Sequence, residues 1–595
     1  MNLAELKIHS GGDTIQANYN KFSDHIRRVT PHGIQCSIFC GGLNCKYENP
    51  ENWTPDSLAI QGIYSHWITD NILAMARPST MIIIQKNVIQ QFKSLGIKSI
   101  INLQCRKEHS SCGQPLEDSE FSYDPNVFME QNIYYYNFSW KDYGDATLDN
   151  LLNMIKVIDF AITEGKVAIH CHAGLGRTGV LIACYLVYSL KVSANDAIRY
   201  VRLKRPGSVQ TRGQILCVRH FAQFILPQTI TFYIKETAAK DKHMTAFTLR
   251  KYLKRQRIVL HGYEARRFKD LPKIVYVICE RILKLCACND DMDDREYDVS
   301  LTKNYLTEKL SNVCKRQNST YSIASITSPT LETVFSNCLS ETPTPSSPNT
   351  SINNDHISDS LSEISTLDGD ELSEENLLET RCFQELETQK MFNQEHVEDE
   401  QVVYHVHDVI NALVGDSVNS NSESRRKIRQ YQNELNFTTI GWLRLSHETD
   451  LKILANLLFE WLEELKEPII KLEHFENIVI LYKQPEDCFK KFTLEESYLI
   501  EYLLIFLSKL QPISQEDLQN LLKRFISSLS KQTVTLRGRL APSGKSFKRI
   551  GEGTLSCTLT FMESLLEIVQ SHHRQNNDDV KFCEKYCDEI EQDFE

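Results

Sequence analysis

One cysteine and one arginine, six positions apart, carry the most specific chemistry that this sequence offers. Cys171 and Arg177 lie within residues 167–190, which begin with a short apolar run and continue, after two glycines, into an apolar stretch of helical length. A strand, a glycine-bearing loop and a helix N-terminus form a cradle for anions, because backbone N–H groups point inward and the helix dipole adds positive charge. We expect this cradle to favour the thiolate form of Cys171, while Arg177 holds two phosphate oxygens.

The residues around this loop are predicted to form an α/β domain, with a mostly parallel central sheet flanked by helices. Residues 65–79 read as an extended segment ending at a proline, 87–95 as a helix, 97–103 and 133–140 as strands, and 148–163 as a second helix. Strands that alternate with helices in this way are typical of parallel sheets. Two further helices are expected after the loop, beginning at capping sequences at 193–196 and 211–214.

The sequence HCHAGLGRTG at 170–179 resembles the signature of the cysteine-based protein tyrosine phosphatases. The resemblance implies a phosphocysteine intermediate on Cys171 and no metal or other cofactor. It also implies that Thr178 donates a hydrogen bond to the Cys171 sulfur, and that His170 orients the loop. The phosphate would be held by the backbone and by Arg177, along the set His172, Ala173, Gly174, Leu175, Gly176 and Arg177.

A thiolate that cleaves a phosphate ester needs an acid to protonate the departing oxygen. Asp142 is the favoured candidate, because it follows Trp140 at the spacing that the resembled family uses for this acid. Asp145 is the alternative, since related dual-specificity enzymes place the acid at a slightly different spacing. Whichever of the two is not the acid is expected to lie in a solvated turn.

Three residues outside the loop are candidates for supporting roles. Gln210 and Gln214 belong to a segment similar to a loop beside the active site of dual-specificity phosphatases. This resemblance implies that they orient the hydrolytic water. The alternative is that the segment is simply the start of an ordinary helix. Cys105 follows a predicted strand, where a related lipid phosphatase keeps a resolving thiol. A reversible disulfide between Cys105 and Cys171 is one hypothesis, and a lone structural cysteine is the other.

Three cysteines gather near the N-terminus, at Cys36, Cys40 and Cys45. They could begin a zinc site with His32 as a fourth ligand. Their spacing is not the paired CxxC pattern of most zinc modules, and no second pair follows them. The sequence therefore favours structural thiols over a metal site.

The chain divides by composition into six parts. Residues 312–385 are rich in Ser, Thr, Asn and acids, and cannot bury enough apolar surface to offset chain entropy, so we expect a disordered linker. Apolar positions at helical spacing return after it and predict a separate all-α domain. The expected parts are an N-terminal extension (1–50), the phosphatase domain (51–228), a helical extension (229–311), the linker (312–385), a helical C-terminal domain (386–575) and an acidic tail (576–595).

Composition narrows the classes of function. The formal net charge of −12 and the lack of a basic face argue against nucleic-acid binding. No apolar run reaches the length of a membrane span, no secretory signal is recognisable, and 18 scattered cysteines suggest reduced thiols in the cytoplasm.

The predicted activity is hydrolysis of phosphotyrosine in proteins, with phosphoserine and phosphothreonine as further substrates. The alternatives are a phosphoinositide phosphatase, or a phosphoprotein-binding scaffold with a dead pocket. His172 and Leu175 stand where phosphoinositide phosphatases carry lysines, which favours phosphoprotein. Over residues 30–290 the chain resembles one subfamily associated with cilium formation or maintenance, which implies the centrosome or cilium base as an alternative location. The C-terminal helices are expected to dock a protein partner.

Overall fold

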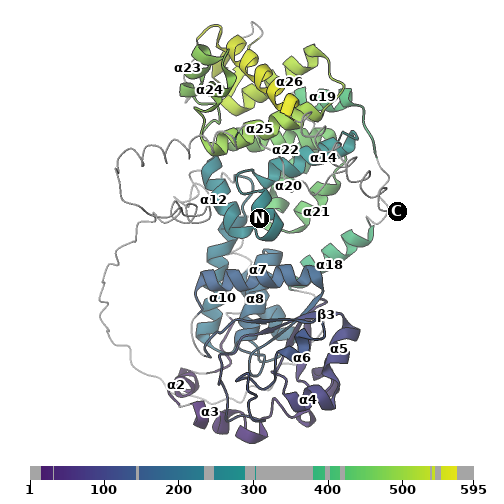
Figure 1. The fold of residues 1–595 in the computed structure, drawn as a ribbon, viewed down its shortest axis with the longest axis vertical. Coiled ribbons are helices and arrows are strands. Elements are labelled where there is room, and N and C mark those ends of the chain that lie inside the picture. The colour runs from purple at the N-terminus through teal and green to yellow at the C-terminus, as the bar shows by residue number, and fades with distance from the viewer. Residues whose placement is uncertain are drawn as a thin grey trace, which may run out of the picture. The chain divides into compact units, whose positions relative to one another are not determined.

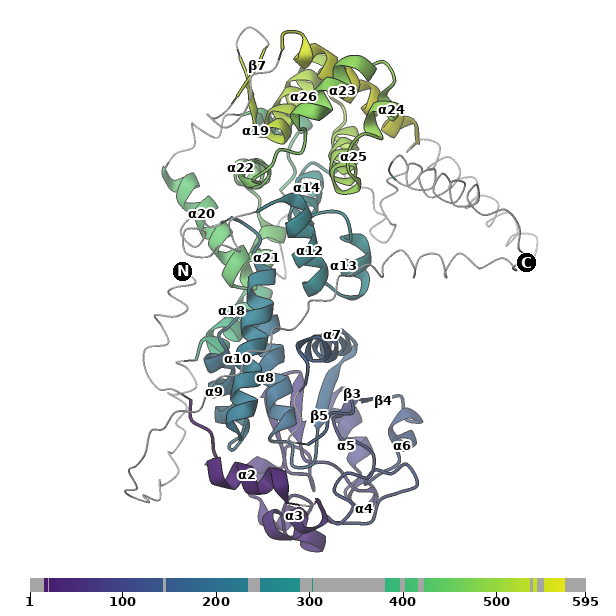
Figure 2. The same ribbon diagram turned by 90° about the vertical axis from the view of Figure 1, so that its left-hand side faces the viewer.

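A computed structural model describes most of both predicted domains (Figures 1 and 2). The described residues are 15–19, 21–30, 32–142, 146–233, 247–288, 302, 380–395, 402–415, 422–535, 539–542 and 551–572. The predicted linker 312–385 therefore lies outside the described residues except for its last six positions, and the predicted tail 576–595 lies outside them entirely. Helix α18 (Arg381–Glu395) begins within those last linker positions.

The N-terminal domain is built on a five-stranded sheet in the order β1-β2-β5-β3-β4. Only β1 runs antiparallel to its neighbour, so the predicted mostly parallel sheet is confirmed. His170, the last residue of β5, is paired with Met75 of β2 and Asn102 of β3. Because three parallel strands end at the same level, the loops that follow them meet at Cys171. The strands are β1 (Ser65–Thr69), β2 (Ile72–Met75), β3 (Ile97–Asn102), β4 (Tyr134–Asn137) and β5 (Lys166–His170).

Helices cover both faces of this sheet, and alternate strand residues divide between two cores. Ile101 and Ile169 face the core formed with α7 and α8, whereas Ile100 and Ala168 face the core formed with α4 to α6. Figures 1 and 2 show these two groups on opposite sides of the sheet. The three central residues of β5, Val167, Ala168 and Ile169, are apolar because both faces of the strand are buried. The helices are α4 (Thr80–Gln85), α5 (Val88–Leu95), α6 (Asn126–Met129), α7 (Leu148–Glu164), α8 (Arg177–Leu190), α9 (Ala194–Lys204) and α10 (Arg212–Ile225).

The predicted helix boundaries are largely reproduced, because local capping sets them. Gly96 ends α5 in the left-handed conformation, with φ of 76°, and Ser193 caps α9. The predicted capping box from Thr211 to Gln214 opens α10. The extended segment 65–79 proves to be the β1–β2 hairpin. Strand β4 is shorter than predicted and is a partly exposed edge strand. Beyond its end, the backbone N–H groups of Phe138 and Trp140 still donate to the carbonyl oxygens of Asn102 and Leu103.

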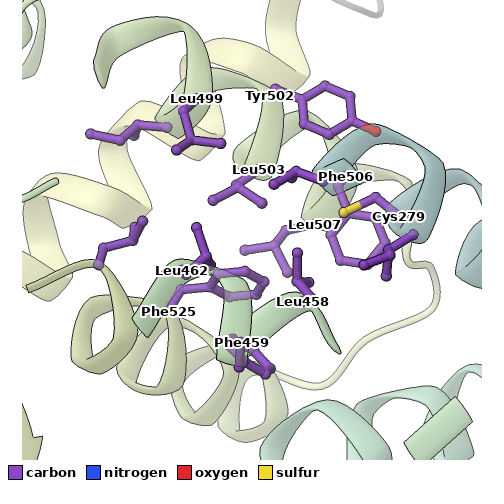
Figure 3. Packing of buried hydrophobic residues seen from close by; sticks show 14 of the residues in the cluster. Cys279, Leu458, Phe459, Leu462, Leu499, Tyr502, Leu503, Phe506, Leu507 and Phe525 are labelled. Atoms are coloured by element: carbon purple, nitrogen blue, oxygen red, sulfur yellow. The ribbon is translucent and has the colours of Figure 1, made fainter. Parts of the chain in front are cut away.

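Most of the helices that follow α10 share a further core, separate from the two cores of the sheet. Cys279 of α14 packs with Tyr502 and Phe506 of α25, beside Leu458 and Leu462 of α22 (Figure 3). Thus helices on both sides of the predicted linker contribute to one core. This part contains η4 (Leu226–Thr229), α12 (Leu249–Val259), α13 (Gly262–Arg267), α14 (Lys273–Leu285), α19 (Val406–Val414), α20 (Ser422–Phe437), α21 (Ile440–His447), α22 (Leu451–Glu464), α23 (Leu472–Leu481), α24 (Pro485–Phe489), α25 (Leu494–Lys509), α26 (Gln515–Ser530), β6 (Gln532–Val534) and β7 (Leu540–Pro542).

Among the described residues, no helix combines the length and the apolar character that crossing a bilayer requires.

Candidate active site

The loop 171–176 closes into a bowl between β5 and α8, with Cys171 at its start and only 4% exposed. Gly174 has φ of +69°, and a Cβ there would lie 2.0 Å from the carbonyl oxygen of Met75, so a larger residue would not fit. The buried guanidinium of Arg205 donates to the carbonyl oxygens of Gly174 (2.7 Å) and Ala173 (2.9 Å). Arg205 therefore occupies those two carbonyl oxygens, an arrangement that suits a loop whose N–H groups bind an anion.

His170 fixes the first residue of the loop through its ring. Its Nδ1 donates to the Cys171 carbonyl oxygen (3.0 Å), and its Nε2 accepts from the Tyr123 hydroxyl (2.7 Å). The side chain is fully buried, and burial lowers the pKa of His170 to about 4. The ring is therefore neutral at physiological pH, and its two hydrogen bonds hold the first residue of the loop in place.

Arg177, at the first turn of α8, is held by carboxylate and carbonyl groups. Both of its Nη atoms donate to the carboxylate of Glu108, with Nη1 at 2.9 Å from Oε2. Nη1 also donates to the carbonyl oxygen of Trp140 at 2.6 Å. These contacts fix the plane of the guanidinium, and the Trp140 contact ties the segment that carries Asp142 to the phosphate loop.

Asp142 lies against this guanidinium. Its Oδ1 is 3.4 Å from Arg177 Nε, and its Oδ2 is 3.3 Å from His109 Nε2. Burial alone would raise the pKa of Asp142, but the charges of Arg177 and His109 outweigh it and hold this pKa well below its usual range. Asp142 is thus a carboxylate in the ligand-free protein. The competing Asp145 lies outside the described residues.

Three other predicted site residues, Thr178, Gln210 and Gln214, lie near Cys171 without contacts that establish their roles. Thr178 Oγ1 is buried and has no hydrogen-bond partner within the described chain, so the expected bond to the Cys171 sulfur is not formed in this structure. Gln210 and Gln214 both line the pocket above Cys171. Gln214 Oε1 accepts from the Gln210 backbone N–H (2.7 Å), and the Gln210 side chain donates to the Tyr19 hydroxyl (2.7 Å).

Cys105 does not line the same pocket as Cys171. It belongs to a neighbouring hollow with Glu108, His109 and Asp142, and its backbone N–H donates to Glu108 Oε2 at 3.0 Å. Burial and the nearby Glu108 raise the pKa of the Cys105 thiol, which makes it less reactive. The disulfide hypothesis for Cys105 and Cys171 stays a prediction.

The pocket above Cys171 has a volume of about 180 Å³, and part of its wall comes from the predicted N-terminal extension. Helices α2 (Lys21–Val29) and α3 (His32–Phe39) and the turn η1 (Gly42–Asn44) belong to this segment, at one end of the domain (Figures 1 and 2). Tyr19, Phe39 and Tyr47 give the wall an aromatic character, and Arg27 and Lys46 give it positive charge. The sequence motifs alone contained no sign that residues 19–47 approach the catalytic loop.

Sequence reasoning also missed three residues that hold the site together. Glu108 and His109 belong to an irregular loop after β3, and no local pattern distinguishes them from a solvated loop. Arg205 lies in the phrase noted around Gln210, but its role becomes visible only from its contacts with the phosphate loop. The one sequence feature that pointed to Arg205 is its position just before Pro206, at the end of a predicted helix.

We expect Glu108→Gln to lower kcat/KM about 10- to 100-fold on an aryl phosphate, because a neutral amide cannot hold the Arg177 fork as a carboxylate does. Glu120→Gln is the matched control: Glu120 belongs to the same loop region but pairs with the exposed Lys107. Steady-state kinetics of both purified variants provide the measurement. Equal kcat/KM values for Glu108→Gln and the wild type would show that Arg177 needs no such partner.

Comparison with known proteins finds related sequences for the N-terminal half. Residues 82–223 match the family model described as the dual specificity phosphatase, catalytic domain. The chain is 52% identical over 284 residues to a zebrafish (Danio rerio) protein named protein tyrosine phosphatase domain-containing protein 1, covering 48% of this chain and 39% of that protein. A bovine (Bos taurus) protein of the same name is 55% identical over 282 residues, covering 47% of this chain and 34% of that protein. The matches thus span less than half the length of these relatives.

Among solved structures, Tk-PTP in its active form shares 23% identity with this chain. The match covers 27% of this chain and 96% of that one, with a TM-score of 0.22.

Proposed function

Since residues 82–223 belong to the dual specificity phosphatase family, we propose that this protein hydrolyses phosphotyrosine in proteins through a phosphocysteine intermediate. The observation that carries the proposal is the convergence of Cys171, Arg177 and Asp142 on one pocket. These residues supply a nucleophile, a phosphate clamp and a proton donor. The alternative that the sequence left open is a phosphoprotein-binding scaffold with a dead pocket.

In the first step, the Cys171 sulfur attacks phosphorus, and the P–O bond to the leaving group breaks. Inward-facing N–H groups of the loop and the Nε edge of Arg177 stabilise the phosphoryl oxygens in the transition state. The leaving oxygen takes a proton from Asp142. A phosphate dianion bound beside Arg177 offsets its positive charge and so raises the pKa of Asp142 from its ligand-free value, which favours the acid form when it is needed.

In the second step, a water molecule gives a proton to Asp142, and its oxygen attacks phosphorus while the S–P bond breaks. Inorganic phosphate and the Cys171 thiolate result. Thr178 is the second residue of α8, and its buried hydroxyl would donate a hydrogen bond to the departing sulfur. Gln210 and Gln214 line the pocket and are the candidates that would orient the water.

Phosphotyrosine is the favoured substrate because the pocket wall is aromatic. Tyr19, Phe39 and Tyr47 lie around the space above Cys171, and a phenyl ring entering between them would gain apolar and ring–ring contacts. His172 does not bring a charge to the pocket floor, since its ring turns toward Cys45 and Cys112. Leu175 is buried in the core of the sheet. These positions therefore do not supply the basic floor that would suit a phosphoinositide.

The test compares phosphotyrosine peptides, phosphoserine or phosphothreonine peptides and phosphoinositide vesicles on the full chain. We expect kcat/KM for phosphotyrosine peptides to exceed the values for the other two substrate classes at least about 10-fold, because one or two additional ring contacts contribute that much binding energy. Fastest turnover of phosphoinositide would contradict the substrate assignment. Phosphate release no faster than from Cys171→Ser on every substrate would favour the scaffold.

Localisation and partners stay proposals that rest on resemblance. We propose a cytoplasmic protein, with the centrosome or cilium base as the alternative location and cilium formation or maintenance as the process. The C-terminal helical core is proposed to dock a protein partner. Its described helices have no part in the pocket above Cys171.

A further inference from the structure

Four potential metal ligands from three separate segments meet beside the phosphate loop. Cys40 and Cys45 come from the N-terminal segment, Cys112 from the loop after β3, and His172 from the phosphate loop itself. Their ligand atoms all lie within 4.8 Å of one another, and all four side chains are buried. The family model begins at residue 82, so half of this group lies outside it.

The distances within the group suit one tetrahedral ion. Sγ of Cys112 is 3.5 Å from Sγ of Cys40 and 3.2 Å from Nε2 of His172, and Sγ of Cys45 is 3.6 Å from the same nitrogen. A tetrahedral zinc ion with usual bond lengths spaces its sulfur and nitrogen ligands about 3.5–3.8 Å apart. All the cysteines concerned are free thiols, so no disulfide accounts for the closeness.

The described residues of the N-terminal segment form no apolar core besides this group. Its buried apolar cluster consists of cysteines alone, with Tyr47 packed against them. Ile34, Ile38 and Leu43, which could have formed an apolar core here, are exposed. Short segments without such a core usually depend on a disulfide or a metal for their structure. Four reduced thiols packed together would give little stabilisation by comparison with metal–thiolate bonds.

Neighbouring groups hold the ligands in place. The His172 ring stacks on His109, with ring centroids 4.0 Å apart. The Gly113 backbone N–H donates to the Gly42 carbonyl oxygen at 2.9 Å, which joins the loop of Cys112 to the loop between Cys40 and Cys45. Partners of this kind orient metal ligands before the ion binds.

We propose that Cys40, Cys45, Cys112 and His172 bind one zinc ion that fastens residues 36–47 to the phosphate loop. Three thiolates and an imidazole form a donor set typical of zinc, and four protein ligands leave no open position for catalysis. The ion is therefore structural. Its effect on the reaction is indirect, because His172 follows Cys171 in the chain, and Phe39 and Tyr47 of the fastened segment line the substrate pocket.

Cys36 is assigned to the surroundings of the ion. Its Sγ lies 3.1 Å from His109 Nδ1, and Cys36 packs in the same buried cluster as Cys40 and Cys112. The alternative is a zinc site formed by Cys36, Cys40, Cys45 and Cys112. In that site, replacing Cys36 would remove the zinc and replacing His172 would not, whereas the proposed site predicts the reverse.

The test measures the metal content of the full chain, purified under reducing conditions without chelators. We expect about one zinc ion per chain, and a loss of most of it in Cys45→Ser and Cys112→Ser. Cys184→Ala, at a buried cysteine of α8 outside the group, should keep the wild-type content. Wild-type protein without zinc, or full zinc in Cys112→Ser, overturns the proposal. Iron or copper in place of zinc overturns the identity of the ion.

A second measurement does not depend on whether the variants fold. Wild-type protein in which Co²⁺ replaces the metal should show thiolate-to-cobalt charge-transfer absorption and the ligand-field bands of a tetrahedral site. Absence of both overturns the site.

Full zinc in His172→Ala together with its loss in Cys36→Ser overturns the assignment of the fourth ligand. None of these readouts uses phosphatase activity, so the metal proposal stands or falls apart from the proposed function.

Discussion

Cys171→Ser should lower turnover of phosphate esters more than about 10⁴-fold, because a serine hydroxyl in this loop lacks the nucleophilicity of a thiolate. The bowl that holds phosphate should survive, since Arg205 and His170 fix it through backbone carbonyl groups. We therefore expect the variant to bind phosphate or tungstate about as well as the wild type. Kinetics with an aryl phosphate, and titration of the oxyanion, provide the two measurements.

The control for this prediction is Cys217→Ser, at a half-buried cysteine of α10 that is absent from the pocket lining. It should leave both turnover and oxyanion binding near wild type. Turnover by Cys171→Ser at the wild-type rate would remove the phosphocysteine mechanism. Loss of oxyanion binding together with turnover would instead show that the sulfur is needed to build the bowl.

Asp142→Asn should slow the enzyme by an amount that depends on the leaving group. For an alkyl or unsubstituted phenyl phosphate, the departing oxygen needs a proton, and we expect a loss of about 10²- to 10⁴-fold. For a nitrophenyl phosphate, whose leaving group is stable as an anion, the loss should be much smaller. A plot of log kcat/KM against leaving-group pKa, steeper for the variant than for the wild type, is the measurement.

The pH dependence of turnover provides a second test of Asp142 as the proton donor. In the proposed mechanism the acid form of Asp142 is the reactive one, so wild-type turnover of a poor leaving group should fall as pH rises through the pKa of Asp142 in the substrate complex. Asp142→Asn cannot titrate and should lose this descending limb. Asp145→Asn is the matched control and should keep it. A flat profile for Asp145→Asn instead would assign the acid to the alternative residue.

The catalytic loop could be predicted from the sequence because its parts are neighbours in the chain. Cys171, the two glycines and Arg177 lie within seven residues, and a strand, turn and helix N-terminus impose the bowl locally. Helix ends at Gly96, Ser193 and Thr211 were predictable for the same reason, since each is decided within one turn of helix.

The groups that hold the loop could not be predicted, because they are far apart in the sequence. Glu108 lies 69 positions from Arg177, and Arg205 lies 31 positions from Gly174. Glu108 reaches Arg177 because the parallel strands β3 and β5 end at one edge of the sheet. Arg205 reaches the phosphate loop because it ends α9, which packs against α8. No periodicity or local motif records such a pairing.

The cysteine group shows the same division most clearly. The sequence showed Cys36, Cys40 and Cys45 near one another but offered no second pair, and it therefore favoured structural thiols. The fold supplies Cys112 and His172, which are 72 positions from Cys40 and 127 positions from Cys45. By itself, then, the sequence determined the strand, loop and helix start that carry Cys171 and Arg177, because backbone geometry within a few residues is a local property. Only the tertiary structure decided which residues hold that loop in place and which residues line its pocket, because those contacts join residues that are far apart in the sequence.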